Sequence, residues 1–137
     1  MAERKNQNLK EIIDKYIEVS QERILAAENL YKDGLFRDSI SRAYYAMLDI
    51  CNAVLLTKGL EPKSHAGSIR LFSLHFIKTG IISDKFSAML SRIEDKRAEA
   101  DYTQLVDFTK DDAERILAKA KEFVSEVKSY LERAEFI

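Results

Sequence analysis

Arg97 is a charged residue at a position where helical spacing otherwise places apolar side chains. It lies four residues after Ile93 and seven after Leu90, so it continues their stripe. A buried guanidinium needs a partner, because removing one member of a buried ion pair costs about 3–5 kcal/mol. Asp101 follows one helical turn later and can supply the carboxylate. On these residues alone, the simplest interpretation is an ion pair at the end of a helical bundle that reaches water.

A second set of polar residues follows helical spacing between residues 36 and 58. Intervals of four and three residues put five of them on one helix face, opposite an apolar stripe: Asp38, Arg42, Tyr45, Asp49 and Asn52. The simplest interpretation is a solvated face. An aromatic residue among polar groups instead favours a contact surface. Beside this face lie residues that would let a second helix approach, for example from another subunit: Ala46, Ile50 and Ala53.

The two histidines lie in unrelated settings. Lys63 and His65 come just before a predicted helix, where free backbone N–H groups can bind an anion, but an ordinary polar loop is the favoured interpretation of these residues alone. His75 lies within an apolar run and is expected to be a core histidine.

The sequence contains no Gly-rich phosphate loop, His-Glu-x-x-His, Cys-x-x-Cys or Glu-x-x-His. We therefore expect no cofactor, no metal site and no nucleophilic triad.

Composition restricts the class of protein. Twenty-two basic residues face 23 acidic ones, so no global basic field attracts nucleic acid, and any RNA contact must come from a local cluster. Cys51 is the sole cysteine, which excludes an intrachain disulfide. No apolar run approaches the roughly 20 residues that cross a bilayer, and residues 1–10 lack a signal-peptide core. We expect a cytoplasmic protein that does not bind membranes.

Five helices are predicted to position these residues, with no strands. Their expected ranges are about 8–32, 36–58 and 64–78, a fourth from Ser83 and a fifth from Thr109, where Asp112 completes an approximate capping box. The third has little polar face and is expected to be the most buried. Short connections at Gly34 and Gly80 make neighbours antiparallel. We expect one all-α, up-and-down bundle over residues 1–137, with its core at about 9–133 and residues 101–108 packed against it.

Three segments together carry a family resemblance. They are DSISRAYYAML at 38–48, KGLEPKSH at 58–65 and RAEADY at 97–102. In this order they resemble the second helix, the turn into the third helix and the end of the fourth helix in the HEPN family, the nucleotide-binding domain of higher eukaryotes and prokaryotes. The resemblance is to a small stand-alone prokaryotic branch and covers about residues 10–133.

The resemblance implies a helical bundle that commonly forms a homodimer. Many relatives are encoded beside a minimal nucleotidyltransferase and form a toxin–antitoxin or similar two-component pair. Several branches are metal-independent endoribonucleases, with a site at the dimer interface made by an Arg, a His four to six residues later and a polar residue of the second helix. Carried over, the Arg is Arg97, and Asp49 or Asn52 is the helix-two group.

This chain departs from that pattern at Tyr102, which stands where the family has its His. A Tyr with a pKa near 10 is a poor base at neutral pH, whereas a His near 6.5 exchanges protons readily. Arg97 could still neutralise phosphate charge during attack by a 2′-OH. His65 would have to replace the missing base.

Three functions follow as hypotheses. The first is a dimeric HEPN subunit that binds nucleotide or RNA and pairs with a nucleotidyltransferase. The second is an active metal-independent endoribonuclease toxin that uses Arg97, Asp101 and Tyr102. The third is a structural helical adaptor. The candidate nucleotide- or RNA-binding residues are Arg42, Tyr45, Asp49, Asn52, Lys63 and His65.

Overall fold

A computed structural model of the chain describes the backbone of residues 2–137 and the side chains of residues 8–137. The elements in chain order are α1 (Ala2–Lys32), α2 (Phe36–Leu56), α3 (His65–Phe72), the π-helical turn η1 (Ser73–Ile77), the 3₁₀ turn η2 (Asp84–Phe86), α4 (Ser87–Tyr102) and α5 (Lys110–Arg133). The described residues contain no strand, and the predicted all-α bundle is confirmed. No helix among residues 2–137 combines the length and apolarity needed to cross a bilayer.

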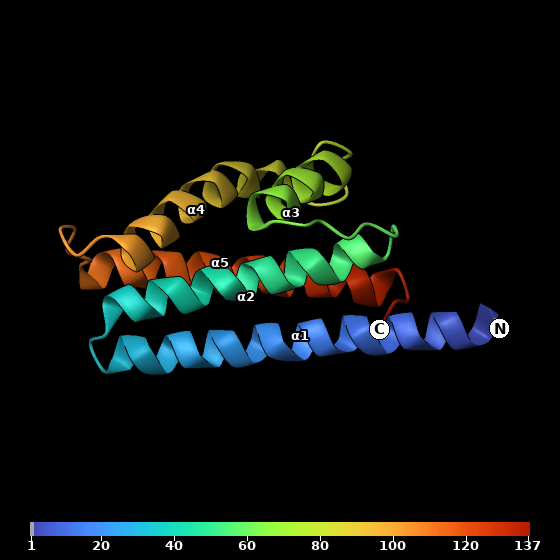
Figure 1. The fold of residues 1–137 in the computed structure, drawn as a ribbon, viewed down its shortest axis with the longest axis horizontal. Helices are drawn as coiled ribbons and strands as arrows, with labels where there is room; N and C mark the ends of the chain where they lie inside the picture. The colour runs from blue at the N-terminus through green and yellow to red at the C-terminus, as the bar shows by residue number, and fades with distance from the viewer. Residues whose placement is uncertain (1) are drawn as a thin grey trace.

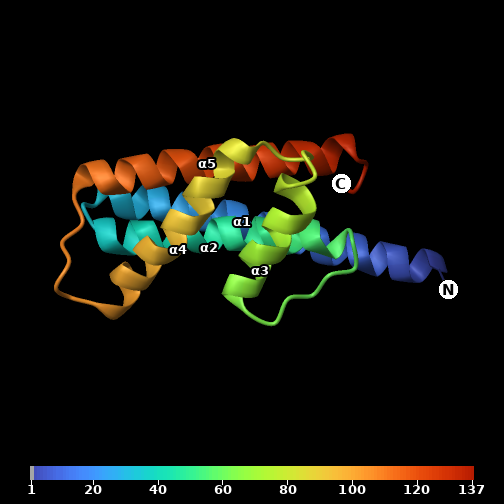
Figure 2. The same ribbon diagram turned by 90° about the horizontal axis from the view of Figure 1, so that it is seen from above.

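Helix α2 lies at the centre of the bundle. It packs against α1, α3, α4 and α5. Helices α1, α2 and α5 run side by side along the long axis, while α3 and α4 form a shorter layer on the other side of α2 (Figure 1). Seen from above, the axis of α4 runs obliquely to the axes of α2 and α5 (Figure 2). The third helix was expected to be the most buried, which is wrong, because its Leu74 is 48% exposed whereas α2 is covered on most sides.

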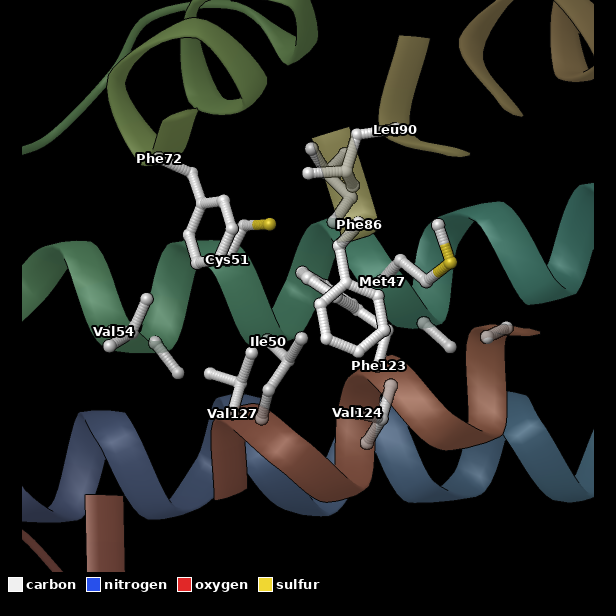
Figure 3. Packing of buried hydrophobic residues seen from close by; sticks show 14 of the residues in the cluster. Met47, Ile50, Cys51, Val54, Phe72, Phe86, Leu90, Phe123, Val124 and Val127 are labelled. Atoms are coloured by element: carbon white, nitrogen blue, oxygen red, sulfur yellow. The ribbon is translucent and has the colours of Figure 1, made fainter. Parts of the chain in front are cut away.

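Aromatic contacts join the two layers. The ring of Phe123 on α5 makes edge contacts with Phe72 on α3 and Phe86 on η2, at centroid distances of 5.3 and 5.2 Å. Figure 3 shows these rings around the α2 side chains Met47 and Cys51. Such tilted aromatic pairs add about 0.5–1.5 kcal/mol beyond the area they bury. They connect α3 and the η2 turn, which directly precedes α4, to α5.

The predicted helix boundaries are largely confirmed. Thr109 and Asp112 form a full capping box at the start of α5. Gly34 and Gly80 have φ values of +78° and +81°, a region that favours glycine after a helix end. Ser83 caps as expected, but the turn that it caps is 3₁₀, and the α-helix itself begins at Ser87.

The small-residue face of α2 is filled by the chain's own first helix. Ala46, Ile50 and Ala53 have no exposed surface. The buried Ser20 of α1 donates a hydrogen bond to the Ala46 carbonyl oxygen at 2.7 Å. A second helix does approach this face, as predicted, but the expectation that it could belong to another subunit is wrong.

Candidate functional site

Arg97 lies on the side of α4 that faces α2, and only 7% of its surface is exposed. Its Nη2 contacts Glu94 Oε1 at 2.6 Å, one turn earlier on the same helix. Its Nη1 makes two longer contacts of 3.5 Å, with Asp101 Oδ2 and with Tyr102 Oη. The terminal nitrogen Nη2 is therefore held firmly by a carboxylate, whereas Nη1 is held only by long contacts.

Two aromatic rings flank this guanidinium. Its central carbon lies 4.9 Å from the ring centre of Tyr44 on α2 and 5.6 Å from that of Tyr102. Burial opposes the charge of Arg97, but the bonds to Glu94 and Tyr102 raise its pKa above the ordinary value, so it stays cationic. Burial and the Glu94 carboxylate also raise the pKa of Tyr44, so its phenol stays neutral.

Three buried polar atoms of this cluster have no hydrogen-bond partner within the described part of the protein. They are Tyr44 Oη, Glu94 Oε2 and Arg97 Nε. An unsatisfied buried polar atom costs about 1–3 kcal/mol. Such atoms are rare in folded proteins. The Glu94 carboxylate is close enough to Tyr44 to raise the pKa of its phenol, so Arg97 Nε is the donor of this cluster that lacks an acceptor within the described residues.

Asp101 joins α4 to α2. Its Oδ1 accepts a hydrogen bond from Ser41 Oγ at 2.9 Å, while Oδ2 faces Arg97. Tyr102 follows with 80% of its surface exposed. The three residues proposed from the sequence as a catalytic group thus lie together, with Tyr102 at the entrance and Arg97 inside.

A second cluster continues from Tyr44 toward α1. The His65 ring lies 6.3 Å from Tyr44 and 5.7 Å from Tyr45. The Arg23 guanidinium of α1 lies 5.4 Å from the Tyr45 ring and pairs with Asp49 at 3.0 Å. Tyr44 thus lies between Arg97 and His65, and the two clusters form one continuous row of polar and aromatic groups.

Asp49 corrects the prediction of a solvated face on α2. Only 7% of its surface is exposed, and burial raises its pKa to about 6 against the opposing effect of Arg23. Tyr45 and Asn52 are half-buried, and Asn52 accepts a hydrogen bond from Ser68 Oγ at 2.7 Å. The reason is that α1 and α3 cover this side of α2.

Other candidates lie outside this row. Asp38 and Arg42 are exposed on α2, as expected of a solvated face, and Lys63 is exposed in the connection before α3. His75 was expected to be a core residue, but it is half-buried on η1. Among the side chains of residues 8–137, no group of three or more His, Cys, Asp and Glu residues could hold a metal ion.

Sequence reasoning missed Arg37, which holds the end of α4 in place. Its guanidinium donates to the carbonyl oxygens of Glu99, Ala100, Thr103 and Val106, the Ala100 bond being 2.9 Å long. It also lies 5.2 Å from the Phe108 ring. The expected packing of residues 101–108 is therefore right for Phe108. It is wrong for Leu105, which is 94% exposed.

Known proteins resemble this chain in sequence over most of its length. The model of the HEPN domain family matches residues 13–130. A Methanocaldococcus jannaschii protein named "putative toxin" is 38% identical over 126 residues, which cover 92% of this chain and 93% of the relative. A second protein of that organism with the same description is 34% identical over 87% of this chain and 81% of its own length. A "UPF0332 protein" of Pyrococcus horikoshii is 42% identical over 81 residues, which cover 59% of this chain and 57% of the relative.

Proposed function

The chain belongs to the HEPN domain family, and we propose that it binds nucleotide or RNA through Arg97 as a subunit of a two-component, toxin–antitoxin-like system. The proposed partner is a minimal nucleotidyltransferase, and the proposed assembly state is a homodimer. Two relatives named "putative toxin" support the coarser part of this proposal.

The observation that carries the proposal is that Arg97 has hydrogen-bond donors without a close acceptor. Glu94 occupies Nη2 at 2.6 Å, but Nε has no partner within the described part of the protein and Nη1 has only contacts of 3.5 Å. Nη1 and Nε lie on different edges of the guanidinium, and Glu94 holds Nη2 between them, so Nη1 is the donor open to a phosphate oxygen. A phosphate oxygen has to displace only Asp101, which keeps its bond to Ser41.

Aromatic side chains support a nucleotide as the ligand. Tyr102 is exposed beside Arg97, and Tyr45 and His65 lie further along the same row. Bases stack on such rings with little sequence preference, at about 1–3 kcal/mol per base. A phosphate held by the guanidinium would therefore place a base within reach of the Tyr102 ring.

The proposed homodimer rests on the apolar surface at the entrance. Tyr102 and Leu105 are the two most exposed large hydrophobic residues of the described chain, at 80% and 94%. A contiguous exposed apolar surface beside a polar site often marks a protein contact. A second protomer that covered them would enclose the Arg97 cluster.

An endoribonuclease is the second candidate, favoured by the Asp101 carboxylate beside Arg97 and by the relatives' description as toxins. In that mechanism Asp101 would accept the 2′-OH proton and Arg97 would neutralise the phosphate. Tyr102 is not suited to accept this proton, because a phenol has a pKa near 10.

Binding and integrity of one labelled single-stranded RNA, measured with EDTA present, separate these functions. We expect the wild-type protein to bind the RNA, leave it intact and also bind ATP. Arg97→Ala and Arg97→Lys should weaken binding at least tenfold, because Ala removes the charge and Lys cannot hold Glu94 and a phosphate oxygen on two separate nitrogens. The exposed Arg70 provides a matched control, and Arg70→Ala should change nothing.

Two results would overturn the binding role. Wild-type cleavage that Arg97→Lys abolishes would establish the endoribonuclease instead. An Arg97→Lys variant that melts earlier but binds RNA and ATP as the wild type does would establish the structural adaptor.

A further inference from the structure

A groove separates α4 from α5 on the side of α4 away from Tyr44. One part of it has a volume of about 130 Å³ and is lined by Met89, Arg92, Ile93, Lys96, Asp112, Arg115, Ile116 and Lys119. An adjoining part of about 190 Å³ shares Met89, Arg92 and Lys119 and adds Lys85, Phe86, Ala88 and Glu122. We call the two parts together the α4–α5 groove. Figure 2 shows the oblique course of α4 relative to α5.

The groove concentrates positive charge in a chain whose net charge is −1. Its walls carry five Lys and Arg side chains and two carboxylates. Lys85 pairs with Glu122 at 2.6 Å and Arg115 with Asp112 at 3.2 Å, which uses both carboxylates. Lys96 pairs with Glu99, one turn away on α4, at 3.6 Å, so among the described side chains that line the groove Arg92 and Lys119 are the cations that form no ion pair. The groove therefore has cations available for an anionic ligand.

The cations form two rows with an apolar floor between them. Arg92 and Lys96 lie four residues apart on α4, and Arg115 and Lys119 lie four apart on α5. The floor is aliphatic: the half-buried Ile116 supplies its accessible surface, and Met89 and Ile93, 8% and 3% exposed, lie beneath it. Each row thus runs along one wall, and apolar atoms separate the walls.

We propose that the α4–α5 groove binds an acidic amphipathic segment of a protein partner. An apolar helix face would cover the aliphatic floor, and Glu or Asp side chains on its flanks would meet the two cationic rows. The chemistry fits RNA less well, because single-stranded nucleic acid uses exposed aromatic rings to stack its bases. The ring that lines the groove, Phe86, is already packed edge-on against Phe123 and under the Lys85 ammonium, so it offers no face to a base.

This groove is separate from the Arg97 site. Arg97 faces α2 and the Tyr44 ring, whereas Arg92 and Lys96 face α5. A protein segment in the groove would leave the entrance at Tyr102 open. The inference rests on the proposed function only in supposing that a protein partner exists.

The test uses a designed probe, a fluorescently labelled peptide with Leu at helical three- and four-residue spacing and Glu at the other positions. We expect saturable binding to the full chain that weakens as salt rises. The double variant Arg92→Glu/Lys119→Glu should bind at least tenfold more weakly. The matched control Arg70→Glu/Lys78→Glu changes one exposed Arg and one exposed Lys elsewhere and should bind like the wild type.

Amide NMR shifts locate the bound probe. Shifts confined to residues of α4 and α5 that line the groove support the proposal, as does failure of the same peptide with Lys in place of Glu. Equal binding by both double variants, or no peptide binding at all, overturns it. Binding of oligouridine, but not of the peptide, that is lost in Arg92→Glu/Lys119→Glu would assign the groove to RNA and also overturn it.

The Arg97→Lys variant distinguishes failure of this inference from failure of the proposed function. It should bind the peptide normally and RNA poorly. If it binds RNA normally while the groove results hold, the proposed function alone fails.

Discussion

Arg97 shares features with a structural ion pair and with a ligand-binding arginine. A purely structural guanidinium would have its donors satisfied by neighbours, whereas this one keeps Nε unpartnered within the described residues and two contacts of 3.5 Å on Nη1. Its neighbours are also acidic, so one positive charge faces the carboxylates of Glu94 and Asp101. Phosphate binding therefore depends on how strongly Asp101 competes.

Asp101→Asn should strengthen RNA binding three- to tenfold, because it removes a carboxylate that competes with phosphate for Nη1. That gain corresponds to about 1 kcal/mol, in the range of a partly exposed ion pair. The Asn side chain can still accept the Ser41 hydrogen bond. Anisotropy titrations of wild-type and variant protein measure the change. Weaker binding, or loss of an RNA-cleaving activity, would instead make Asp101 a working part of the site.

Asp49 should make stability depend on pH. Because its pKa is raised from 3.8 to about 6 in the folded protein, the folded state binds a proton more tightly than the unfolded state does. Its contribution to the free energy of unfolding is therefore greatest below about pH 4 and falls by up to about 3 kcal/mol as pH rises to about 6.

The Asp49→Asn variant isolates this effect, since Asn does not titrate. Relative to the wild type, it should gain stability between pH 4 and pH 7, as measured by urea unfolding at several pH values. Parallel curves for the two proteins would show that the pKa of Asp49 is not raised.

At the scale of elements, helix positions were predictable and helix environments were not. The capping box at Thr109 and the break at Gly34 depend on neighbouring residues, so spacing alone revealed them. The burial of Asp49 depends on Arg23 of α1 and on the covering helices, which are distant in sequence. A period of 3.6 residues identifies the faces of α2 but not what covers each face.

The candidate site was predictable to the same extent. Arg97, Asp101 and Tyr102 lie within one helical segment, so their proximity followed from sequence spacing. The contacts of Arg97 with Tyr44 and of Arg37 with Ala100 join separate helices. Tyr44 follows the apolar spacing of α2, and this spacing gives no sign of its second role as a cation–π partner of Arg97.

Arg37 should control the order of the segment that carries Asp101 and Tyr102. Arg37→Lys keeps the charge but cannot bridge four carbonyl oxygens, and hydrogen bonds to charged groups contribute about 1.5–3 kcal/mol each. We expect faster hydrogen exchange at the amides of residues 100–108, weaker RNA binding and a lower melting temperature. Arg115→Lys, at an exposed arginine, is the control. Unchanged exchange in Arg37→Lys would show that other contacts hold this segment.

At the scale of the whole molecule, the entrance to the site is the place where large apolar side chains are left uncovered. Helices α1, α2 and α5 form a continuous apolar core with the α3 and α4 layer, yet Tyr102 and Leu105 stay exposed at its edge. Core packing does not use these side chains. Their exposure is consistent with the proposed contact between two copies of the chain.

Leu105→Asp should convert the proposed dimer to a monomer without changing the fold, because a 94% exposed side chain contributes little to the core. Sedimentation equilibrium at micromolar concentration measures the change. Leu25→Asp introduces the same charge at an exposed leucine of α1 and should leave the dimer intact. A monomeric wild type, or a dimeric Leu105→Asp protein, would show that this surface is not the contact.

The most direct measurement is the NMR signal of the Arg97 Nε–H group, assigned by its loss in Arg97→Lys and followed while single-stranded RNA is added. Nε is part of the same conjugated guanidinium as Nη1 and has no hydrogen-bond partner within the described residues, so its proton signal reports a change in the contacts of this group. If phosphate binds Arg97, the signal shifts and saturates at the RNA concentration that saturates binding. RNA that binds while the signal stays unmoved would contradict a binding role for Arg97.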